Sequence, residues 1–136
     1  MKAVFDTNIL ISAIFWRGSP YRCLLAAQAG LVDLYLSPPI LAEFERVLHA
    51  KFHLPTEQID EARAIVRGAA RVVEIAGTVH VVSDDPSDDK FVETAQIAGA
   101  DYLVSGDHHL LTCRAMGDVR VVTARVFLDI LSQSSR

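Results

Sequence analysis

The sequence predicts an α/β fold in which helices cover both faces of a mostly parallel sheet. Short apolar runs suited to buried strands alternate along the 136 residues with helical stretches that have recognisable caps. Strands separated by helices need crossover connections, and these connections produce parallel sheets. A chain of this length fits one domain, since domains commonly hold about 100 to 150 residues. We therefore expect a single soluble domain over residues 1–136.

The first part of the chain predicts two strands and two helices. Lys2–Asp6 is a short, mostly apolar run suited to a buried strand, and Asn8–Phe15 continues as an apolar helix. A Ser-Pro pair opens the next predicted helix, Ser19–Ala29, with the serine as N-cap, and Gly30 ends it. Leu31–Leu36 reads as the second strand.

The middle of the chain predicts two further helices and a stretch of extended structure. Ser37 caps a helix that reaches about His49, and a second helix spans Pro55–Arg67. Val72–Ile75 and Val79–Val82 are predicted to be extended, and a polar turn follows at residues 84–87. The apolar stripe of the first helix consists of Ile40, Leu41, Phe44, Val47 and Leu48.

The last part of the chain completes the alternation. A helix is predicted over Asp88–Ala98, with a glycine as its C-cap, and a strand over Tyr102–Ser105. Gly106–Leu111 should form a loop or a short helix. Arg120–Val122 is the last predicted strand, and Thr123 caps a terminal helix.

Charge and cysteine content exclude several classes of protein. The net charge is -4, which disfavours a protein that grips nucleic acid by bulk positive charge, so any such contact must be local. Cys23 and Cys113 are far apart and lack a metal-binding pattern, so we expect neither a disulfide framework nor a zinc site. No apolar run is long and uncharged enough to span a bilayer. A reducing cytoplasm is the expected location.

Four aspartates are predicted at the carboxyl edge of the sheet, where α/β proteins bind their ligands. Asp6 closes the first strand, and Asp107 follows the Tyr102–Ser105 strand. Asp88 and Asp89 stand at a helix N-terminus that should lie at the same edge. Each could alternatively be a turn or cap residue.

A glutamate could complete this acidic cluster. Glu43 and Glu45 lie about equally far from the apolar stripe of their helix, so periodicity does not choose between them. Mg²⁺ and Mn²⁺ prefer oxygen ligands and are often held by a few carboxylates. A bound metal polarises a phosphoryl oxygen and activates water, so the cluster predicts phosphodiester cleavage.

At these residues the chain resembles the PIN-domain family, especially the small prokaryotic VapC-like ribonucleases that are toxin components of toxin-antitoxin modules. The resemblance covers nearly the whole chain. It is carried, in order, by VFDTNILISAI, LSPPILAEFERVL, DDPSDDKFVETAQIAGADYLVSGD and VRVVTARVFLDIL.

The resemblance implies a three-layer α/β/α fold and Mg²⁺- or Mn²⁺-dependent cleavage of RNA. It also implies a cognate antitoxin as partner, and family members often form homodimers. The positions that match the family's metal-binding and catalytic acids are Asp6, Glu43, Asp89 and Asp107, with Thr7, Asn8, Asp88 and Ser105 in support. A shift of one residue would exchange Asp88 and Asp89.

Two alternative functions share this predicted fold. An aspartyl phosphotransfer or phosphatase domain also places an aspartate after its first strand, but Asp6-Thr7-Asn8 lacks the second aspartate of a D-x-D motif. A catalytically silent binding module would keep the fold, yet here no acidic position has been lost.

A few other side chains could contact RNA. Arg17, Arg22, His108 and His109 flank the acidic motifs and are candidates for phosphate contact. Trp16 could stack on a base or fill a core or dimer contact, and the second interpretation is favoured.

Overall fold

The computed structural model describes residues 1–78, 86–112 and 117–134, and these build a five-stranded sheet. The strands lie in the order β3-β2-β1-β4-β5, and every pairing is parallel. This confirms the predicted α/β fold with its parallel sheet. The strands are β1 (Lys2–Phe5), β2 (Asp33–Leu36), β3 (Ala70–Val72), β4 (Tyr102–Val104) and β5 (Arg120–Val122).

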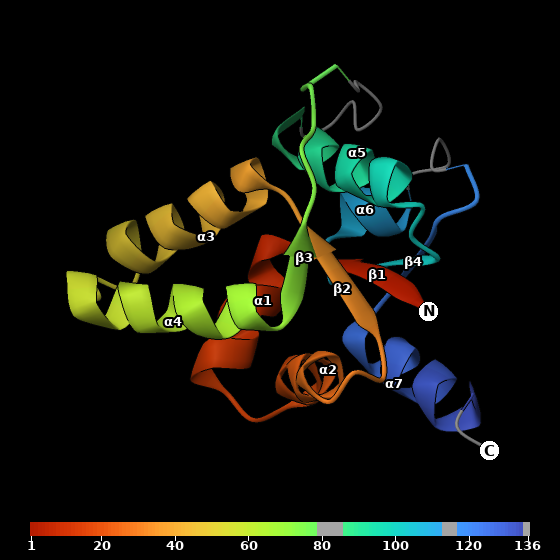
Figure 1. The fold of residues 1–136 in the computed structure, drawn as a ribbon, viewed down its shortest axis with the longest axis horizontal. Coiled ribbons are helices and arrows are strands. Elements are labelled where there is room, and N and C mark those ends of the chain that lie inside the picture. Colours follow the sequence, from red (N-terminus) through yellow and green to blue (C-terminus); the bar gives the residue numbers. More distant parts are fainter. Residues whose placement is uncertain (79–85, 113–116, 135–136) are drawn as a thin grey trace.

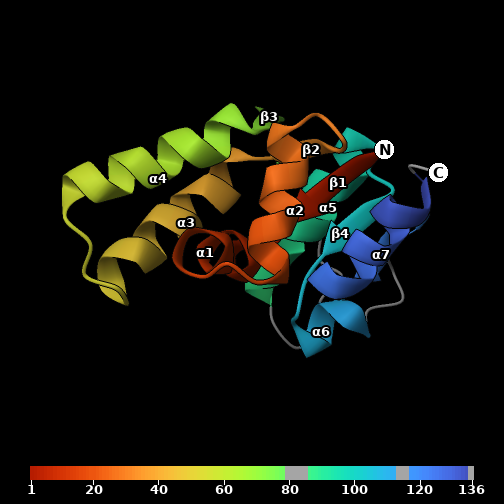
Figure 2. The same cartoon turned by 90° about the horizontal axis from the view of Figure 1, so that it is seen from below.

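Helices cover both faces of the sheet and give the molecule three layers. Figure 1 shows α5 on one side of the sheet and α2 and α7 on the other. Figure 2 shows the layer of α2 and α7 from below. Among the described residues, no helix is long and apolar enough to cross a membrane. The helices are α1 (Thr7–Phe15), α2 (Ser19–Gln28), α3 (Pro38–Ala50), α4 (Thr56–Gly68), α5 (Asp89–Ala98), α6 (His108–Leu111) and α7 (Ala124–Ser134), with a 3₁₀ turn, η1, at Pro86–Asp88.

The central strand β1 is buried on both faces, as expected of a parallel strand between two helical layers. Ala3, Val4 and Phe5 have no solvent exposure. Phe127 of α7 meets the ring of Phe5 edge-on at 6.1 Å and that of Tyr102 at 5.6 Å. These contacts fix one helical layer against β1 and β4.

The strand order reverses at β1, because β2 follows on one side of it and β4 lies on the other. In the pairing of β1 with β4, Phe5 is opposite Val104. The next residues, Asp6 and Ser105, therefore leave the sheet side by side. Ligands of open α/β sheets bind at such a reversal point, beyond the carboxyl ends of the strands.

Most predicted helix ends are confirmed. Gly99 ends α5 in the left-handed conformation, with φ of 65°. The hydroxyl of Thr123 accepts a hydrogen bond from the Val126 amide at 3.2 Å, as a cap does. The start of α2 differs, since Gly18 is its N-cap and Ser19 already lies in the helix. Residues 108–111 form the short helix α6.

The edge strand β3 begins before the predicted Val72–Ile75 strand and ends at Val72. It pairs with Leu34–Leu36 of β2, which sets its extent. The Val73 amide still donates to the Leu36 carbonyl at 2.8 Å, and farther along the chain the amides of residues 76–78 bind the carboxylate of Glu93. The predicted extended segment Val79–Val82 lies outside the described residues, and the predicted turn at 84–87 does so in part.

Candidate active site

Asp6 directly follows the last residue of β1 and is also the N-cap of α1. Its Oδ1 accepts a hydrogen bond from the Ile9 amide at 2.9 Å, and its own amide donates to the Val104 carbonyl at 3.1 Å. Its Oδ2 accepts a hydrogen bond from the Ser105 hydroxyl. The residue is 3% exposed. The alternative interpretation as a helix cap is therefore correct for Asp6, and it is compatible with a place in a site.

Burial raises the pKa of Asp6 to about 6, because the ionised carboxylate loses water. The hydrogen bonds from Ser105 and Ile9 lower this pKa, whereas the charges of Asp107 and Glu43 raise it further. Three acids from separate segments thus act on one another electrostatically. The ionised form of Asp6 lowers the stability of the fold at neutral pH.

Ser105 joins the ends of β1 and β4. Its hydroxyl donates to Asp6 and accepts a hydrogen bond from the Asp107 amide at 2.9 Å. Asp107 in turn caps α6, where its Oδ1 accepts from the His109 amide at 2.7 Å. Ser105 is fully buried, so its hydroxyl holds the two aspartates in a fixed relation.

The two glutamates of α3 have different partners. Glu43 accepts a hydrogen bond from Lys90 Nζ at 2.8 Å and lies 3.4 Å from an Arg46 nitrogen. Glu45 forms an ion pair with Arg63 of α4. Glu45 therefore holds α3 and α4 together, and Glu43 faces the other acids. Periodicity could not make this distinction, because the partner of Glu45 comes from another helix.

Asp88 and Asp89 are adjacent in the sequence, and α5 begins between them. Both side chains are buried, but Asp88 lies in the same cavity as Glu43 and Asp107, whereas Asp89 lines the neighbouring hollow with Lys90 and Glu93. Successive residues of a helix point about 100° apart, which sends the two side chains to different sides. The resemblance placed the third acid at Asp89, and the structure places Asp88 at the cavity.

The acidic cavity has a volume of about 340 Å³ and lies at the carboxyl edge of the sheet. Among the described residues, no three His, Cys, Asp or Glu side chains converge closely enough to form a complete metal site. The buried hydroxyl of Thr7 has no hydrogen-bond partner within the described part of the chain. The lining residues are Thr7, Asn8, Glu43, Arg46, Val47, Ala50, Lys51, Ser87, Asp88 and Asp107.

Several residues around this cavity carry no signal in the sequence. Lys90, whose side chain is 15% exposed, neutralises Glu43 across the gap between α5 and α3. Glu93 is buried, and its carboxylate accepts hydrogen bonds from the amides of Ala76, Gly77 and Thr78 at 2.7 to 2.9 Å. Both contacts join segments far apart in the chain, so spacing could not predict them.

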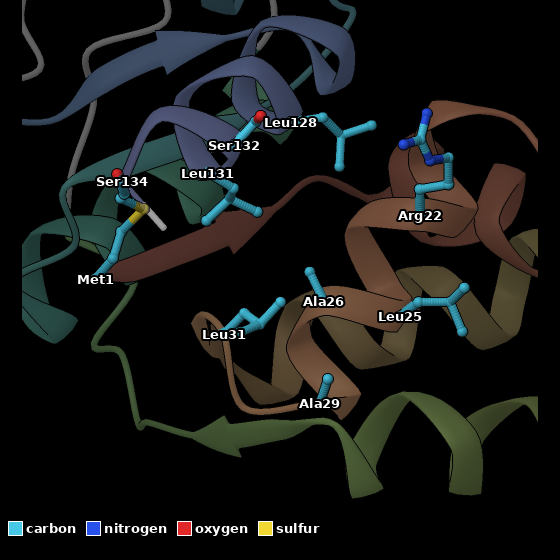
Figure 3. A pocket seen from close by; sticks show the side chains of 10 residues that line it. All are labelled: Met1, Arg22, Leu25, Ala26, Ala29, Leu31, Leu128, Leu131, Ser132 and Ser134. Carbon is cyan, nitrogen blue, oxygen red and sulfur yellow. The ribbon is translucent and has the colours of Figure 1, made fainter. Parts of the chain in front are cut away.

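A larger and mostly apolar hollow lies elsewhere, in a groove of about 700 Å³ between α2 and α7. Figure 3 shows Leu25 and Leu31 on the α2 side and Leu128 and Leu131 on the α7 side. Arg22 also lines this groove and does not line the acidic cavity, so the prediction that it contacts phosphate at the acidic cluster is not supported. No acidic residue is among the groove's lining residues.

A family model described as PIN domain matches residues 2–109. The chain belongs to the PIN-domain family. The matched residues include the acids at positions 6, 43, 88, 89 and 107. The predicted family is thereby confirmed, and so is the fold that the resemblance implied. No curated protein matches this PIN-domain sequence.

Two solved structures are similar to this PIN domain. One is "Crystal structure of VapBC2 from Rickettsia felis bound to a DNA fragment from their promoter", with a TM-score of 0.65, 17% identity, and coverage of 90% of this chain and 98% of that chain. The other is PAE2754 from Pyrobaculum aerophilum, with a TM-score of 0.66, 14% identity, and coverage of 98% and 96%. At these identities the likeness concerns the fold.

Proposed function

We propose that this PIN-domain protein is a metal-dependent endoribonuclease that hydrolyses phosphodiester bonds in RNA. One observation carries the proposal: Glu43, Asp88 and Asp107 come from three separate segments and line one cavity at the carboxyl edge of the sheet. Asp6 lies next to this cavity, and its pKa is raised mainly by burial and further by the charges of Asp107 and Glu43. Like charges gathered in this way lower stability, and such sites are common where a protein performs chemistry.

The donor atoms of this cavity suit Mg²⁺ or Mn²⁺. They are carboxylate oxygens and the buried Thr7 hydroxyl, and the described lining residues include no sulfur or imidazole group. Mg²⁺ commonly keeps several waters and uses only a few carboxylates, so a loose set of acids is sufficient. Asp6, Glu43, Asp88 and Asp107 would hold the ion. When bound, it polarises a phosphoryl oxygen and lowers the pKa of water.

The other residues of the site position these acids and balance their charge. Ser105 orients Asp6 and Asp107 through its two hydrogen bonds. Lys90 holds Glu43 in place and offsets one negative charge. Asp89 lines the adjacent hollow in the first turn of α5. We propose that it helps to position Asp88.

We also propose that the protein is the toxin of a type II toxin-antitoxin module, kept inactive in the cytoplasm by a cognate antitoxin. The likeness to a chain of the VapBC2 complex from Rickettsia felis supports this assignment. A homodimer is the assembly that we expect. Expression of the parent without a partner should arrest growth, whereas the Asp6→Asn variant should not.

The alternatives are less well supported by the geometry. An aspartyl nucleophile must reach its substrate, but Asp6 is buried and both of its carboxylate oxygens accept hydrogen bonds. A silent binding module would not need to retain three acids that line one cavity.

Labelled RNA incubated with the purified protein tests the proposal. Cleavage should require Mn²⁺ or Mg²⁺, stop with EDTA, and return when metal is added in excess. Glu43→Gln should abolish cleavage, and its matched control Glu45→Gln should not, because Glu45 pairs with Arg63. Absence of cleavage with either metal, or equal loss in both variants, would overturn the assignment. Labelled DNA in parallel defines the substrate class.

A further inference from the structure

One face of α3 leads away from the acids along the cavity. Its residues recur at intervals of three and four, which places them on the same side of a helix. The face extends about 12 Å at about 1.5 Å per residue. Its cavity-lining residues are Glu43, Arg46, Val47, Ala50 and Lys51.

A face of α1 likewise begins at the acidic cavity and extends away from it. Asn8 lines the cavity and is exposed, and Ser12 and Trp16 follow it at intervals of four residues. α1 packs against α3, and the two helices lie side by side in Figures 1 and 2. Both faces thus start at the acidic cavity.

An aromatic cluster joins the far ends of these two helices. Phe15 stacks on Phe52 with ring centroids 4.5 Å apart, and Trp16 lies 5.7 Å from Phe15. Trp16 is nevertheless 58% exposed, so it is not a core residue of this chain, and the predicted dimer contact stays a prediction. A large exposed aromatic side chain held by stacked neighbours offers a rigid surface for a flat ligand.

Positive charge lies between the acids and the aromatic cluster. Arg46 keeps 70% of its side chain exposed even though it approaches Glu43. Lys51 forms no ion pair with any residue in the described ranges. In a chain of net charge -4, two cations on the wall of an acidic cavity are a local exception.

We propose that these two helix faces form a track for a single-stranded segment of the RNA that the site cuts. In this track Arg46 and Lys51 contact backbone phosphates, and Trp16 stacks on an unpaired base. The length of about 12 Å limits the track to a few nucleotides. The inference rests on the proposed function, and it assigns Trp16, Arg46 and Lys51 as the residues that bind the RNA strand next to the acidic cavity.

Trp16 is the protein's only tryptophan, so its own fluorescence reports the contact. We would titrate the protein in EDTA with a random-sequence pool of single-stranded RNA 12-mers, and follow both RNA anisotropy and Trp16 emission. Binding should quench the emission saturably. Duplex RNA of the same length should bind at least about tenfold more weakly, because paired bases cannot stack on Trp16.

Variants separate stacking from charge. Trp16→Ala should weaken binding of the 12-mer pool about tenfold, equal to about 1.4 kcal/mol. Lys51→Gln should lower the slope of log affinity against log salt by about 0.7. Ile97→Ala and Arg125→Gln, at exposed positions on α5 and α7, are matched controls that should bind as the parent does.

The outcomes distinguish this track from the nuclease proposal. If Mn²⁺ supports cleavage of the pool but bound RNA leaves Trp16 emission unchanged, the track is wrong and the nuclease stands. Quenching without cleavage would support the track and overturn the nuclease. Duplex binding as tight as that of single strands, or no binding by either signal, would overturn the track.

Discussion

The apolar groove and the acidic cavity lie at opposite ends of β1 and have opposite characters. Met1, before the strand, lines the apolar groove between α2 and α7, and Asp6, after it, belongs to the acidic cluster. The groove is about 700 Å³ and the acidic cavity about 340 Å³. Size and apolar lining alone would favour the groove over the acidic cavity. The chemistry that we propose lies instead at the acidic cavity, which Glu43, Asp88 and Asp107 line.

The largest difference between the two regions should come from Asp6→Asn. The change keeps the shape of the side chain but removes a charge needed to hold metal, so RNA cleavage should fall about 100-fold or more. In EDTA at pH 8 the same variant should unfold with a free energy about 0.5 to 2 kcal/mol above that of the parent. Cleavage assays and denaturant melts on one preparation measure both.

The pH dependence of this stability gain follows from the sign of the pKa shift. The pKa of Asp6 rises from 3.8 to about 6 on folding, so the native state binds the proton more tightly. The cost of ionised Asp6 is absent below pH 4, grows between pH 4 and 6, and is complete above that range, where it reaches about 3 kcal/mol. The advantage of the variant should therefore disappear at pH 4. An advantage that is equal at pH 4 and pH 8 would contradict the assigned cause.

Asp88 and Asp89 should differ in how strongly each affects RNA cleavage. Asp88→Asn should reduce cleavage about 100-fold, because Asp88 lines the cavity with Glu43 and Asp107. Asp89→Asn should act mainly on stability, by about 0.3 to 1 kcal/mol, since Asp89 lies in the first turn of α5. Single-turnover cleavage of RNA by the two variants decides this. The reverse order of activity would restore the assignment made from the resemblance.

Metal should stabilise the acidic cavity and have no effect through the groove. At ten times its dissociation constant, a metal that binds only the native state adds about 1.4 kcal/mol, or about 3 to 6 °C in Tm. Thermal melts with Mg²⁺ and Mn²⁺ measure this. The shift should be lost in Asp6→Asn. A parent Tm that is indifferent to tens of millimolar of either ion would argue against the metal site.

The smallest effect is expected in the groove. Leu31 is 64% exposed, so Leu31→Ala should change the free energy of unfolding by no more than about 0.5 kcal/mol. RNA cleavage should equal that of the parent, because no lining residue of the groove lines the acidic cavity. A large loss of cleavage would mean that the two hollows are coupled.

The local features of this fold were predictable because they depend on neighbouring residues. Helix caps such as Thr123 and Gly99 need only a few adjacent positions, and their roles are confirmed. Asp6 at the end of a buried apolar run could likewise be placed at the carboxyl edge of the sheet. The reversal of strand order at β1 then explains why it meets Ser105.

What could not be predicted depends on contacts between distant segments. Glu43 and Glu45 differ only through their partners, Lys90 of α5 and Arg63 of α4. The early end of β3 depends on its partner strand β2, which ends at Leu36. Whether Asp88 or Asp89 faces the cavity depends on the rotation of α5, which packing against the sheet determines.

Calorimetric titration of Mn²⁺ into the parent, Glu43→Gln and Glu45→Gln tests the central claim most directly, because it measures the metal site without a substrate. We predict that the parent and Glu45→Gln bind Mn²⁺ alike and that Glu43→Gln binds it at least about tenfold more weakly, a difference of about 1.4 kcal/mol. Undetectable binding to the parent, or equal affinity in all three proteins, would contradict the assignment of the acidic cavity as a metal-dependent nuclease site.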